Sequence, residues 1–338
     1  MARDKLRFGV LSTANIGRAA VNPAIQASTN AELVAVASRH PERARAFAEK
    51  GGIPRSHGSY EALLDDPDVD AVYIPLPNSL HREWTIRAAE KKKHVLCEKP
   101  LALSAAECRE MQAAADTHGV RLMEAFMYRF HPRTEKLVEL VRGGATGELR
   151  AVRSAFTFRL LRPENIRLVP ALGGGALMDV GCYCVNVSRT IVGSEPVEAQ
   201  AFAVWGPSGV DVQMAGSLRF ASGVLAQFDC ALTVERREAC EAAGTEASLR
   251  VDFAFLPGTA PVAIVERRGR EAETRHETPG ADEYRLMVEH FADAVLHDRP
   301  LRYGALEAAA NMTAIEALYR SARSDGLPVP VGPRAEVR

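Results

Sequence analysis

Three residues of the chain have the types and the spacing needed for proton transfer. Lys99 stands in Glu98-Lys99-Pro100, directly after an apolar run that predicts a buried strand. Asp179 and Tyr183 are four residues apart in a segment that predicts a helix, so their side chains share one face of it. A positioned tyrosine can move a proton to or from a hydroxyl group, and an ammonium beside it stabilises developing negative charge. We expect the three to meet in one site; a surface lysine, a helix-capping aspartate and a core tyrosine are the structural alternatives.

A second set of residues suits the phosphates of a dinucleotide. The segment 9–17 lies between the first predicted strand and the first predicted helix, the usual place of a glycine-rich binding loop. Its glycines would fall at positions 12, 14 and 17, which here are Ser12, Ala14 and Gly17. Small residues let the backbone approach a pyrophosphate, and the helix N-terminus offers N–H donors. Tight packing without a ligand is the alternative.

The end of the second predicted strand carries cations where an NAD-binding chain usually has an acidic residue. Ser38 and Arg39 lie about 20 residues after Gly17, and Arg43 follows one helical turn later. Two arginines and no carboxylate at 38 or 39 favour the 2′-phosphate of NADP over the free 2′-hydroxyl of NAD. A solvated arginine pair at the start of a helix is the alternative.

These residues must be positioned by a parallel sheet in the first third of the chain. The predicted strands are 6–11, 33–37, 71–74, 94–97 and 121–126, and the predicted helices between them include 41–50, 80–92 and 105–118. Helices on both faces of a parallel sheet give a doubly wound Rossmann domain, which binds its ligand at the carboxyl ends of the strands. We assign this α/β, dinucleotide-binding domain to residues 1–126.

Residues 127–338 predict an α+β domain, for substrate binding and oligomerisation, with a large open, mostly antiparallel sheet covered by helices. The predicted strands are 149–159, 197–205, 212–220, 223–232, 247–255 and 261–267. Helices at 175–191 and 282–297 are expected to cover one face of this sheet. Val204, Leu225 and Phe228 are expected on faces that the helices leave open, which predicts a homodimer or homotetramer through the sheet.

Composition excludes several classes of protein. The 338 residues are enough for two domains with cores of their own. The 42 basic and 43 acidic residues nearly cancel, which gives no general attraction to nucleic acid or to an anionic membrane. Because the N-terminus lacks the pattern of a secretion signal and no apolar run is long enough to span a bilayer, we expect a cytoplasmic protein. The six cysteines lack metal-binding spacing and predict reduced thiols and no metal site.

Together these motifs resemble the Gfo/Idh/MocA oxidoreductase family. The resemblance covers nearly the whole chain and rests on the segments 9–17, 75–81, 98–100, 124–132 and 173–183. In this family the lysine and the aspartate lie in the active site, and the residue four positions after the aspartate acts as acid or base. Many members have histidine there. Tyr183 is similar instead to the branch with D-xylose dehydrogenase, dimeric dihydrodiol dehydrogenase and glucose-fructose oxidoreductase.

The resemblance, with the residues above, implies contacts for a cofactor and a substrate. NADP, with NAD less favoured, would contact Ser12, Thr13, Ala14, Asn15 and Ile16 at the pyrophosphate, Ser38, Arg39 and Arg43 at the ribose phosphate, and Leu76, Asn78, His81, Glu98, Lys99 and Met127 on the nicotinamide side. The substrate would contact Tyr128, Arg129, Phe158, Asn165, Arg167 and Tyr284.

The implied reaction is hydride transfer between nicotinamide C4 and a carbinol or carbonyl carbon of a sugar, polyol or vicinal diol. Tyr183 would deprotonate the substrate hydroxyl in the oxidation direction, Lys99 would stabilise the negative charge, and Asp179 would orient the substrate or hold Lys99. Whether Tyr183 or Lys99 is the nearer base stays open, as do the sugar and the direction. The alternatives are a non-catalytic NADP-binding regulator of the same fold and a reductase of nucleotide-linked keto-sugars.

Overall fold

The computed structural model describes residues 4–332 and divides into two compact units. Within the described residues, unit 1 comprises the chain up to Met127 together with Asp282–Ala309. Unit 2 comprises Tyr128–Ala281 and the chain from Ala310 onward. Residues 1–3 and 333–338, which the sequence analysis included in its two domains, lie outside the described part.

Unit 1 contains a parallel sheet of six strands in the order β3-β2-β1-β4-β5-β6. The strands are β1 (Leu6–Leu11), β2 (Ala31–Ala37), β3 (Arg55–His57), β4 (Ala71–Ile74), β5 (His94–Cys97) and β6 (Leu122–Glu124). The reversal of strand order beside β1 marks the point at which such sheets bind ligands. The prediction of a doubly wound domain is confirmed, although β3 was not predicted.

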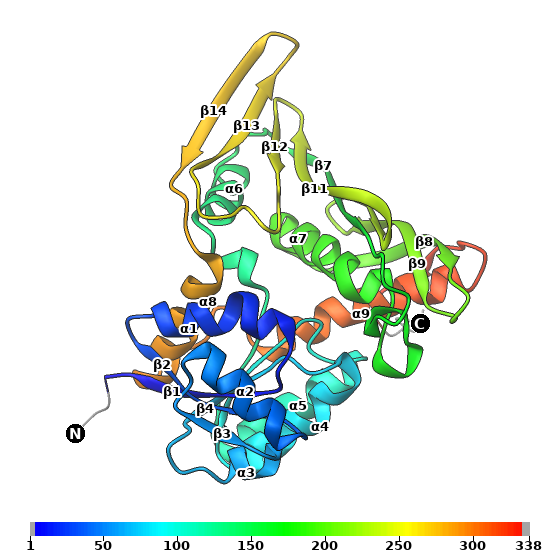
Figure 1. Cartoon of the computed structure of the whole chain (residues 1–338). Helices are drawn as coiled ribbons and strands as arrows, with labels where there is room; N and C mark the ends of the chain where they lie inside the picture. Colours follow the sequence, from blue (N-terminus) through cyan, green and yellow to red (C-terminus); the bar gives the residue numbers. More distant parts are fainter. Residues whose placement is uncertain (1–3, 333–338) are drawn as a thin grey trace. The chain divides into compact units, whose positions relative to one another are not determined.

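Helices cover both faces of this sheet (Figure 1). They are α1 (Asn22–Ala27), α2 (Pro41–Gly51), α3 (Tyr60–Leu64), α4 (His81–Glu90), α5 (Ala105–His118) and α8 (Glu283–Leu296). On one face, Phe8 of β1 contacts Phe291 of α8, with ring centroids 5.9 Å apart. The next residue, Gly9, points to the other face and lies so close to Leu63 of α3 that a Cβ would be 2.6 Å from it.

The position of α8 differs from the sequence-based expectation. The segment 282–297 was expected to cover the second sheet, whereas α8 packs on α1, β1 and β2 of the first. Its buried residues Met287, Val288 and Phe291 form an apolar stripe that suits either sheet, so the periodicity did not specify the partner. Asp282–Ala309 therefore lies in unit 1, not in the second domain where the sequence analysis placed it.

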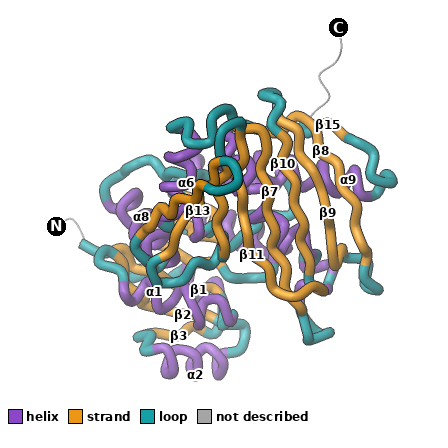
Figure 2. The backbone as a smooth tube through the Cα atoms, turned by 90° about the horizontal axis from the view of Figure 1, so that it is seen from above, coloured by secondary structure: helices purple, strands orange, loops and turns teal. Residues whose placement is uncertain are grey.

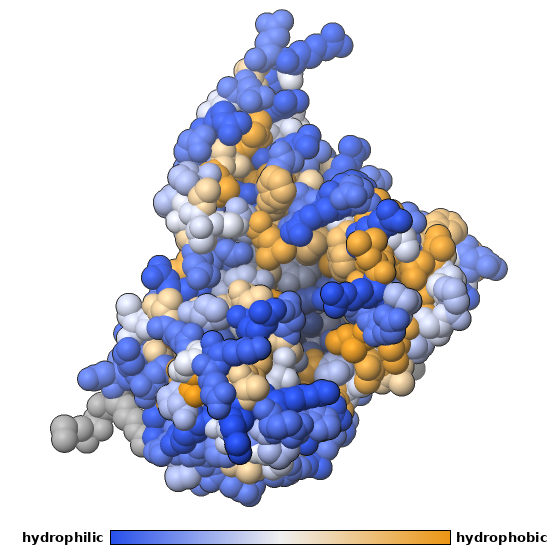
Figure 3. Space-filling view, in the orientation of Figure 1, coloured by the Kyte–Doolittle hydropathy of each residue, from blue (hydrophilic) through white to orange (hydrophobic). Residues whose placement is uncertain are grey.

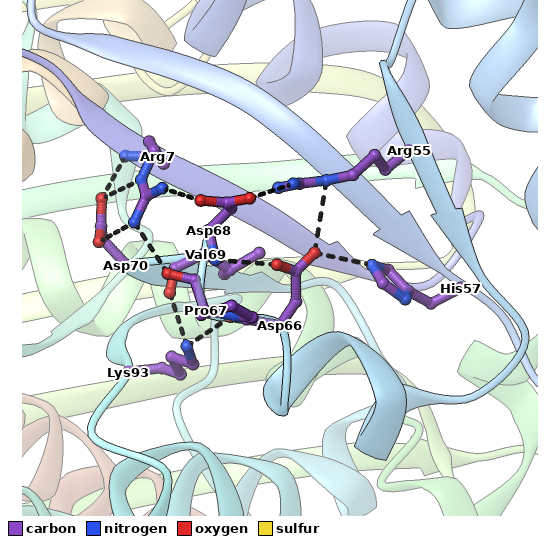
Figure 4. Close-up of polar contacts among 9 residues, drawn as sticks. All are labelled: Arg7, Arg55, His57, Asp66, Pro67, Asp68, Val69, Asp70 and Lys93. Atoms are coloured by element: carbon purple, nitrogen blue, oxygen red, sulfur yellow. Dashed lines mark hydrogen bonds and ion pairs between the residues drawn. The ribbon is translucent and has the colours of Figure 1, made fainter.

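Polar contacts fix the loops at the amino ends of the unit 1 strands (Figure 4). Arg7 of β1 pairs with Asp68 (2.6 Å) and Asp70 (2.8 Å), and Arg55 of β3 also pairs with Asp68 (2.7 Å). The Lys93 ammonium donates to the carbonyl oxygens of Asp66 and Val69. This network lies at the end of the sheet opposite to the carboxyl ends, where ligands bind in such folds.

Unit 2 contains a sheet of nine strands within the described residues, in the order β14-β13-β12-β11-β7-β10-β9-β8-β15 (Figure 2). The strands are β7 (Leu149–Arg159), β8 (Pro196–Trp205), β9 (Asp211–Phe220), β10 (Leu225–Ala231), β11 (Thr233–Gly244), β12 (Ser248–Asp252), β13 (Val262–Arg268), β14 (Ala272–Thr278) and β15 (Val329–Pro330). The pair β7–β10 is parallel and the other pairs are antiparallel. The predicted large, mostly antiparallel sheet is confirmed; β11, β14 and β15 were not predicted.

One face of this sheet carries the helix that holds Asp179 and Tyr183. It consists of the π-helical turn Leu177–Gly181 followed by α7 (Cys182–Val192), and it packs on β7 and β10. Unit 2 also contains α6 (Pro132–Arg142) and most of α9 (Ala305–Ala322).

The opposite face of the sheet exposes Val204 (56%) and Leu225 (49%), as expected. The expectation for Phe228 is wrong, because this side chain is only 5% exposed. Phe228 is three positions after Leu225, and residues an odd number of positions apart on a strand point to opposite faces. Phe228 therefore points to the helix-covered face.

The β13–β14 hairpin forms one edge of the sheet, and hydrophilic side chains cover its tip (Figure 3). Arg267 and Glu273 pair across the two strands at 3.1 Å, and His276 contacts Glu266 at 2.7 Å. Charged side chains on an edge strand oppose pairing with other chains. Elsewhere in the part of the chain that the structure describes, no helix is both long and apolar enough to cross a bilayer.

Candidate functional site

The loop at the carboxyl end of β1 is held by the side chain of Ser12. Ser12 has a φ of 145°, in the region that favours glycine. Its Oγ accepts from the Ala14 N–H (3.1 Å) and donates to the Pro75 carbonyl (3.3 Å). The helix that follows begins at Asn15 and runs on through the π-helical turn Gly17–Val21, which contains no acidic residue. A helix start of this kind fits the pyrophosphate of a dinucleotide.

Two arginines follow β2, the strand that pairs with β1. Ser38 is buried, and its Oγ accepts from the His40 N–H at 3.2 Å. Arg39 and Arg43 are exposed. Burial raises the pKa of Tyr60, and the Arg39 guanidinium, hydrogen-bonded to that tyrosine, opposes the increase. Positions 38 and 39 carry no carboxylate, as the 2′-phosphate of NADP requires.

His81 connects the loops that follow β4 and β5. The side chain is fully buried, with Nδ1 3.0 Å from the Pro100 carbonyl oxygen and Nε2 2.9 Å from the Leu76 carbonyl oxygen. Burial lowers the pKa of His81. His81 thus braces two backbone segments. Leu76 is buried and Asn78 half-buried on the same loop.

Three hydrogen bonds hold the segment that carries Lys99. The Tyr73 hydroxyl donates to Glu98 Oε1 at 2.7 Å, and the Lys99 N–H donates to Glu98 Oε2 at 3.2 Å. After the cis peptide bond to Pro100, the Leu101 N–H donates to Glu124 Oε1 at 2.7 Å. Glu98 and Lys99 are half-buried at the carboxyl end of β5, the end of the sheet where Rossmann domains bind ligands.

Tyr284 and Met127 complete the predicted residues of unit 1. Tyr284 is half-buried at the start of α8, and Met127 is buried. Burial raises the pKa of Tyr73, and the negative charges of Glu98 and of an ionised Tyr284 raise it further. Tyr284 therefore stands near the Tyr73–Glu98 pair.

Aromatic rings surround Tyr183 in unit 2. Its ring centroid lies 5.8 Å from that of Tyr128, 5.3 Å from Phe156 and 5.3 Å from Phe255. Tyr128 is fully buried, and its hydroxyl donates to Asn186 Oδ1 at 2.6 Å. Packing of this density limits the rotamers open to the Tyr183 ring.

Asp179 is paired with an arginine of its own unit. Arg167 Nε donates to Asp179 Oδ2 at 2.5 Å, and the aspartate side chain is only 13% exposed. The Arg167 N–H donates to Asn165 Oδ1, and its guanidinium lies 5.8 Å from the centroid of the Phe158 ring. Phe158, Asn165, Arg167 and Asp179 are thus brought together. Arg129, also expected to contact the substrate, is buried.

The predicted residues therefore form two groups. Unit 1 holds Ser12, Thr13, Ala14, Asn15, Ile16, Ser38, Arg39, Arg43, Leu76, Asn78, His81, Glu98, Lys99, Met127 and Tyr284, and unit 2 holds Tyr128, Arg129, Phe158, Asn165, Arg167, Asp179 and Tyr183. The aromatic neighbours Phe156 and Phe255 were missed, as were the buried Asp211 and its half-buried partner Tyr319. For Asp211 and Tyr319 the sequence offered one signal, the glycine run 173–175, because glycines allow other segments to approach the backbone closely. Within the described residues, no cluster of three or more His, Cys, Asp or Glu side chains is placed to hold a metal ion.

Comparison with known proteins identifies the family. Residues 6–126 match the model of an oxidoreductase family with an NAD-binding Rossmann fold, and residues 134–250 match that of the GFO/IDH/MocA C-terminal domain. D-xylose 1-dehydrogenase (NADP(+)) 2 of Haloferax volcanii is 41% identical over 321 residues, which cover 94% of this chain and 98% of that protein. The chain belongs to the Gfo/Idh/MocA oxidoreductase family. The resemblance seen in the motifs is confirmed.

Solved structures of Gfo/Idh/MocA type match over both units. An aldose-aldose oxidoreductase from Caulobacter crescentus, complexed with glycerol, has a TM-score of 0.89 at 31% identity and covers 96% of this chain and 99% of its own. A 3-ketoreductase from Actinomadura kijaniata, in complex with NADP and TDP-benzene, has a TM-score of 0.90 at 30% identity and covers 94% and 98%. This member of the Gfo/Idh/MocA family is accordingly an oxidoreductase.

Proposed function

We propose that this chain is an NADP-dependent oxidoreductase acting on the CH–OH or carbonyl group of a sugar, polyol or vicinal diol. The observation that carries the proposal is Tyr183, a hydroxyl-bearing side chain held by three aromatic rings on the same helix as the ion-paired Asp179. The 41% identical relative named D-xylose 1-dehydrogenase (NADP(+)) supports the substrate class and the cofactor.

NADP is held by unit 1 in this proposal. The helix start after Ser12 would hold the pyrophosphate, and Arg39 would pair with the 2′-phosphate. When bound, the nicotinamide supplies or accepts the hydride, so the chain itself has to position the substrate and move one proton. Glu98 and Lys99, on the segment fixed by the Tyr73 hydroxyl, would line the nicotinamide side.

The proton moves at the Tyr183 hydroxyl. In the oxidation direction the ionised Tyr183 oxygen takes the proton of the substrate hydroxyl and becomes the neutral phenol, while the Lys99 ammonium stabilises the negative charge on the tyrosine and on the reacting oxygen. Arg167 keeps the Asp179 carboxylate ionised and oriented, so that it accepts hydrogen bonds from substrate hydroxyls. The mechanism requires Lys99 of unit 1 and Tyr183 of unit 2 to converge when substrate is bound.

The test is NADP⁺ reduction, followed by absorbance, with a panel of D-xylose, other aldoses and trans-dihydrodiols. We expect turnover with at least one aldose or diol and a higher kcat/KM with NADP⁺ than with NAD⁺. The 3-ketoreductase relatives make a nucleotide-linked keto-sugar with NADPH the second candidate for the panel. Turnover of that substrate alone would replace the first candidate with the second, and an absence of all turnover would contradict both.

We further propose that the chain forms a homodimer or homotetramer through the exposed face of the unit 2 sheet. Phe202, Val204 and Leu225 are 49% to 62% exposed on that face. Apolar side chains grouped on an open sheet face favour association.

The six cysteines are buried free thiols, which suits a reducing compartment. We therefore propose that the protein lies in the cytoplasm.

A further inference from the structure

Asp211 is a buried carboxylate that the proposed reaction does not use. It lies at the start of β9 and is 1% exposed. Its Oδ2 accepts from the Leu177 N–H at 2.7 Å, and its Oδ1 accepts from the Tyr319 hydroxyl at 2.7 Å. Burial raises the pKa of Asp211 to about 6, and these donors oppose the increase. A carboxylate kept in such a place has its charge balanced by defined partners.

The two side chains occupy the space that Gly175 leaves open. Gly175 has a φ of 125°, and a Cβ there would lie 2.2 Å from Asp211 Oδ1 and 2.9 Å from Tyr319 Oη. Its N–H donates to the Arg167 carbonyl (2.9 Å), and its own carbonyl accepts from the Asp179 N–H (3.0 Å). Gly175 therefore connects the Asp211–Tyr319 pair to Asp179 through backbone hydrogen bonds.

Tyr319 is itself held in place by its neighbours on the sheet edge. Its ring stacks on Trp205, with centroids 6.4 Å apart, and the Arg323 guanidinium lies 5.3 Å from its centroid. This packing restricts the rotamers of Tyr319 and so fixes the position of its hydroxyl beside Asp211. The pair meets the helix at Leu177, two residues before Asp179 and six before Tyr183.

We propose that Asp211 and Tyr319 form a clamp that sets the position and rotation of the helix start carrying Asp179 and Tyr183. This inference rests on the proposed function, and both are positioning residues. The helix start contains the π-helical turn Leu177–Gly181, a wider and rarer geometry than an α-helical turn, and its N-cap residue Ala176 supplies no side-chain hydrogen bond. A carboxylate bonded to the first N–H of that turn selects one register, and with it one direction for the Tyr183 ring.

The first test compares steady-state kinetics of the variants. Tyr319→Phe and Asp211→Ala are expected to lower kcat by up to about 10²-fold, because the reacting hydroxyl is displaced, while the Kd for NADPH stays at the wild-type value. Asp211→Asn keeps one oxygen for the Leu177 N–H and is expected to recover most of the kcat lost in Asp211→Ala. The matched control is Thr157→Val, which removes another hydroxyl bond of unit 2, to the Glu235 carbonyl, on the face away from α7. It should lower the melting temperature without lowering kcat.

The second test does not depend on a substrate. Hydrogen exchange of the amides at 176–183 is expected to accelerate in Tyr319→Phe, with exchange in β7 unchanged. If the wild-type protein turns over no substrate, the proposed function fails and this exchange pattern alone decides on the clamp. Unchanged kcat together with unchanged exchange at 176–183 would overturn the clamp, as would exchange that rises equally throughout unit 2.

Discussion

At the scale of single residues, Asp179 is paired with Arg167 and lies four residues before Tyr183 on the same helix. The sequence analysis left it either to orient the substrate or to hold Lys99, and the structure adds Arg167 from its own unit. A guanidinium beside a carboxylate of low exposure favours the charged form of that carboxylate. In the proposed reaction Asp179 therefore serves as an acceptor for substrate hydroxyls and does not act as a proton donor.

Arg39 is the residue on which cofactor preference depends in this account. A hydrogen bond to a charged group contributes about 1.5–3 kcal/mol, so Arg39→Ala is expected to weaken NADPH binding by roughly 10- to 150-fold and to leave NADH binding nearly unchanged. Arg43→Ala, one turn further along, should have a smaller effect. Calorimetric Kd values for both cofactors check this, and an unchanged NADPH affinity in Arg39→Ala would show that the 2′-phosphate binds elsewhere.

At position 12 we expect glycine to give a more stable protein than alanine, the reverse of the usual order. Alanine ordinarily stabilises a chain relative to glycine, but at a φ of 145° a side chain costs on the order of 1–3 kcal/mol. Ser12→Ala keeps this strain and loses the bond from the Ala14 N–H, whereas Ser12→Gly loses the bond and the strain together. We expect Ser12→Gly to be the more stable variant by about 1 kcal/mol in urea unfolding. The opposite order would contradict the observed conformation of this loop.

At the scale of elements, the stability of unit 2 depends on pH through Asp211, which binds the start of the helix that carries Asp179 and Tyr183. The pKa of Asp211 is raised from 3.8 to about 6, so its contribution to stability is fully present below pH 3.8 and is lost as the pH rises through 6. The shift corresponds to about 3 kcal/mol. Tyr319 and Cys230, which face Asp211 from α9 and β10, have pKa values raised well above their ordinary range and do not titrate in this window.

The corresponding experiment compares wild type with Asp211→Asn at pH 5 and pH 7.5. The stability of the variant relative to wild type should rise between the two pH values by about 1.4 kcal/mol, because only the last unit below the folded-state pKa of about 6 is crossed and the amide has no charge to bury. Thermal unfolding followed by circular dichroism measures this difference. An equal difference at both pH values would show that Asp211 does not titrate in this range.

Elements with one clear hydrophobic period were predictable from the sequence, and others were not. β1, β4, β5 and α5 were predicted with the bounds that the structure has. β11 was missed because its sequence Thr-Val-Glu-Arg-Arg-Glu-Ala-Cys-Glu-Ala-Ala-Gly is rich in charged residues and alanine, which are uncommon in strands. Its pairing with β7 and β12 overrides that propensity.

Contacts between distant segments account for the rest of what the sequence analysis missed. The helical period of 282–297 was correct, but its partner sheet depended on Phe8 meeting Phe291, which no local pattern encodes. Asp211 and Tyr319 are separated by 108 residues and meet only because β9 and α9 approach the glycine turn. Lys99, Asp179 and Tyr183 could be proposed from the sequence because their motifs are local, whereas the aromatic neighbours of Tyr183 come from three separate segments.

At the scale of the whole molecule, the proposed association through the unit 2 sheet predicts a mass above the 36.7 kDa of one chain. The double variant Val204→Glu, Leu225→Glu places charges on the exposed face and is expected to give monomers in light scattering at micromolar concentration. Leu161→Glu is the matched control, because Leu161 is 75% exposed in a loop outside that face. A wild-type protein of 36.7 kDa in the same measurement would contradict the proposed assembly.

The central claim is that Tyr183 moves the proton in an NADP-dependent reaction on a sugar or diol. The measurement that tests it most directly is kcat for NADP⁺ reduction by wild type and Tyr183→Phe with the best aldose or diol of the panel, alongside the Kd of each for NADPH. We expect kcat to fall by about 10²-fold or more in Tyr183→Phe, since the ring and its packing remain and only the hydroxyl is lost, and we expect the Kd to stay the same. A kcat near the wild-type value would contradict the claim and make Lys99 the base to test next.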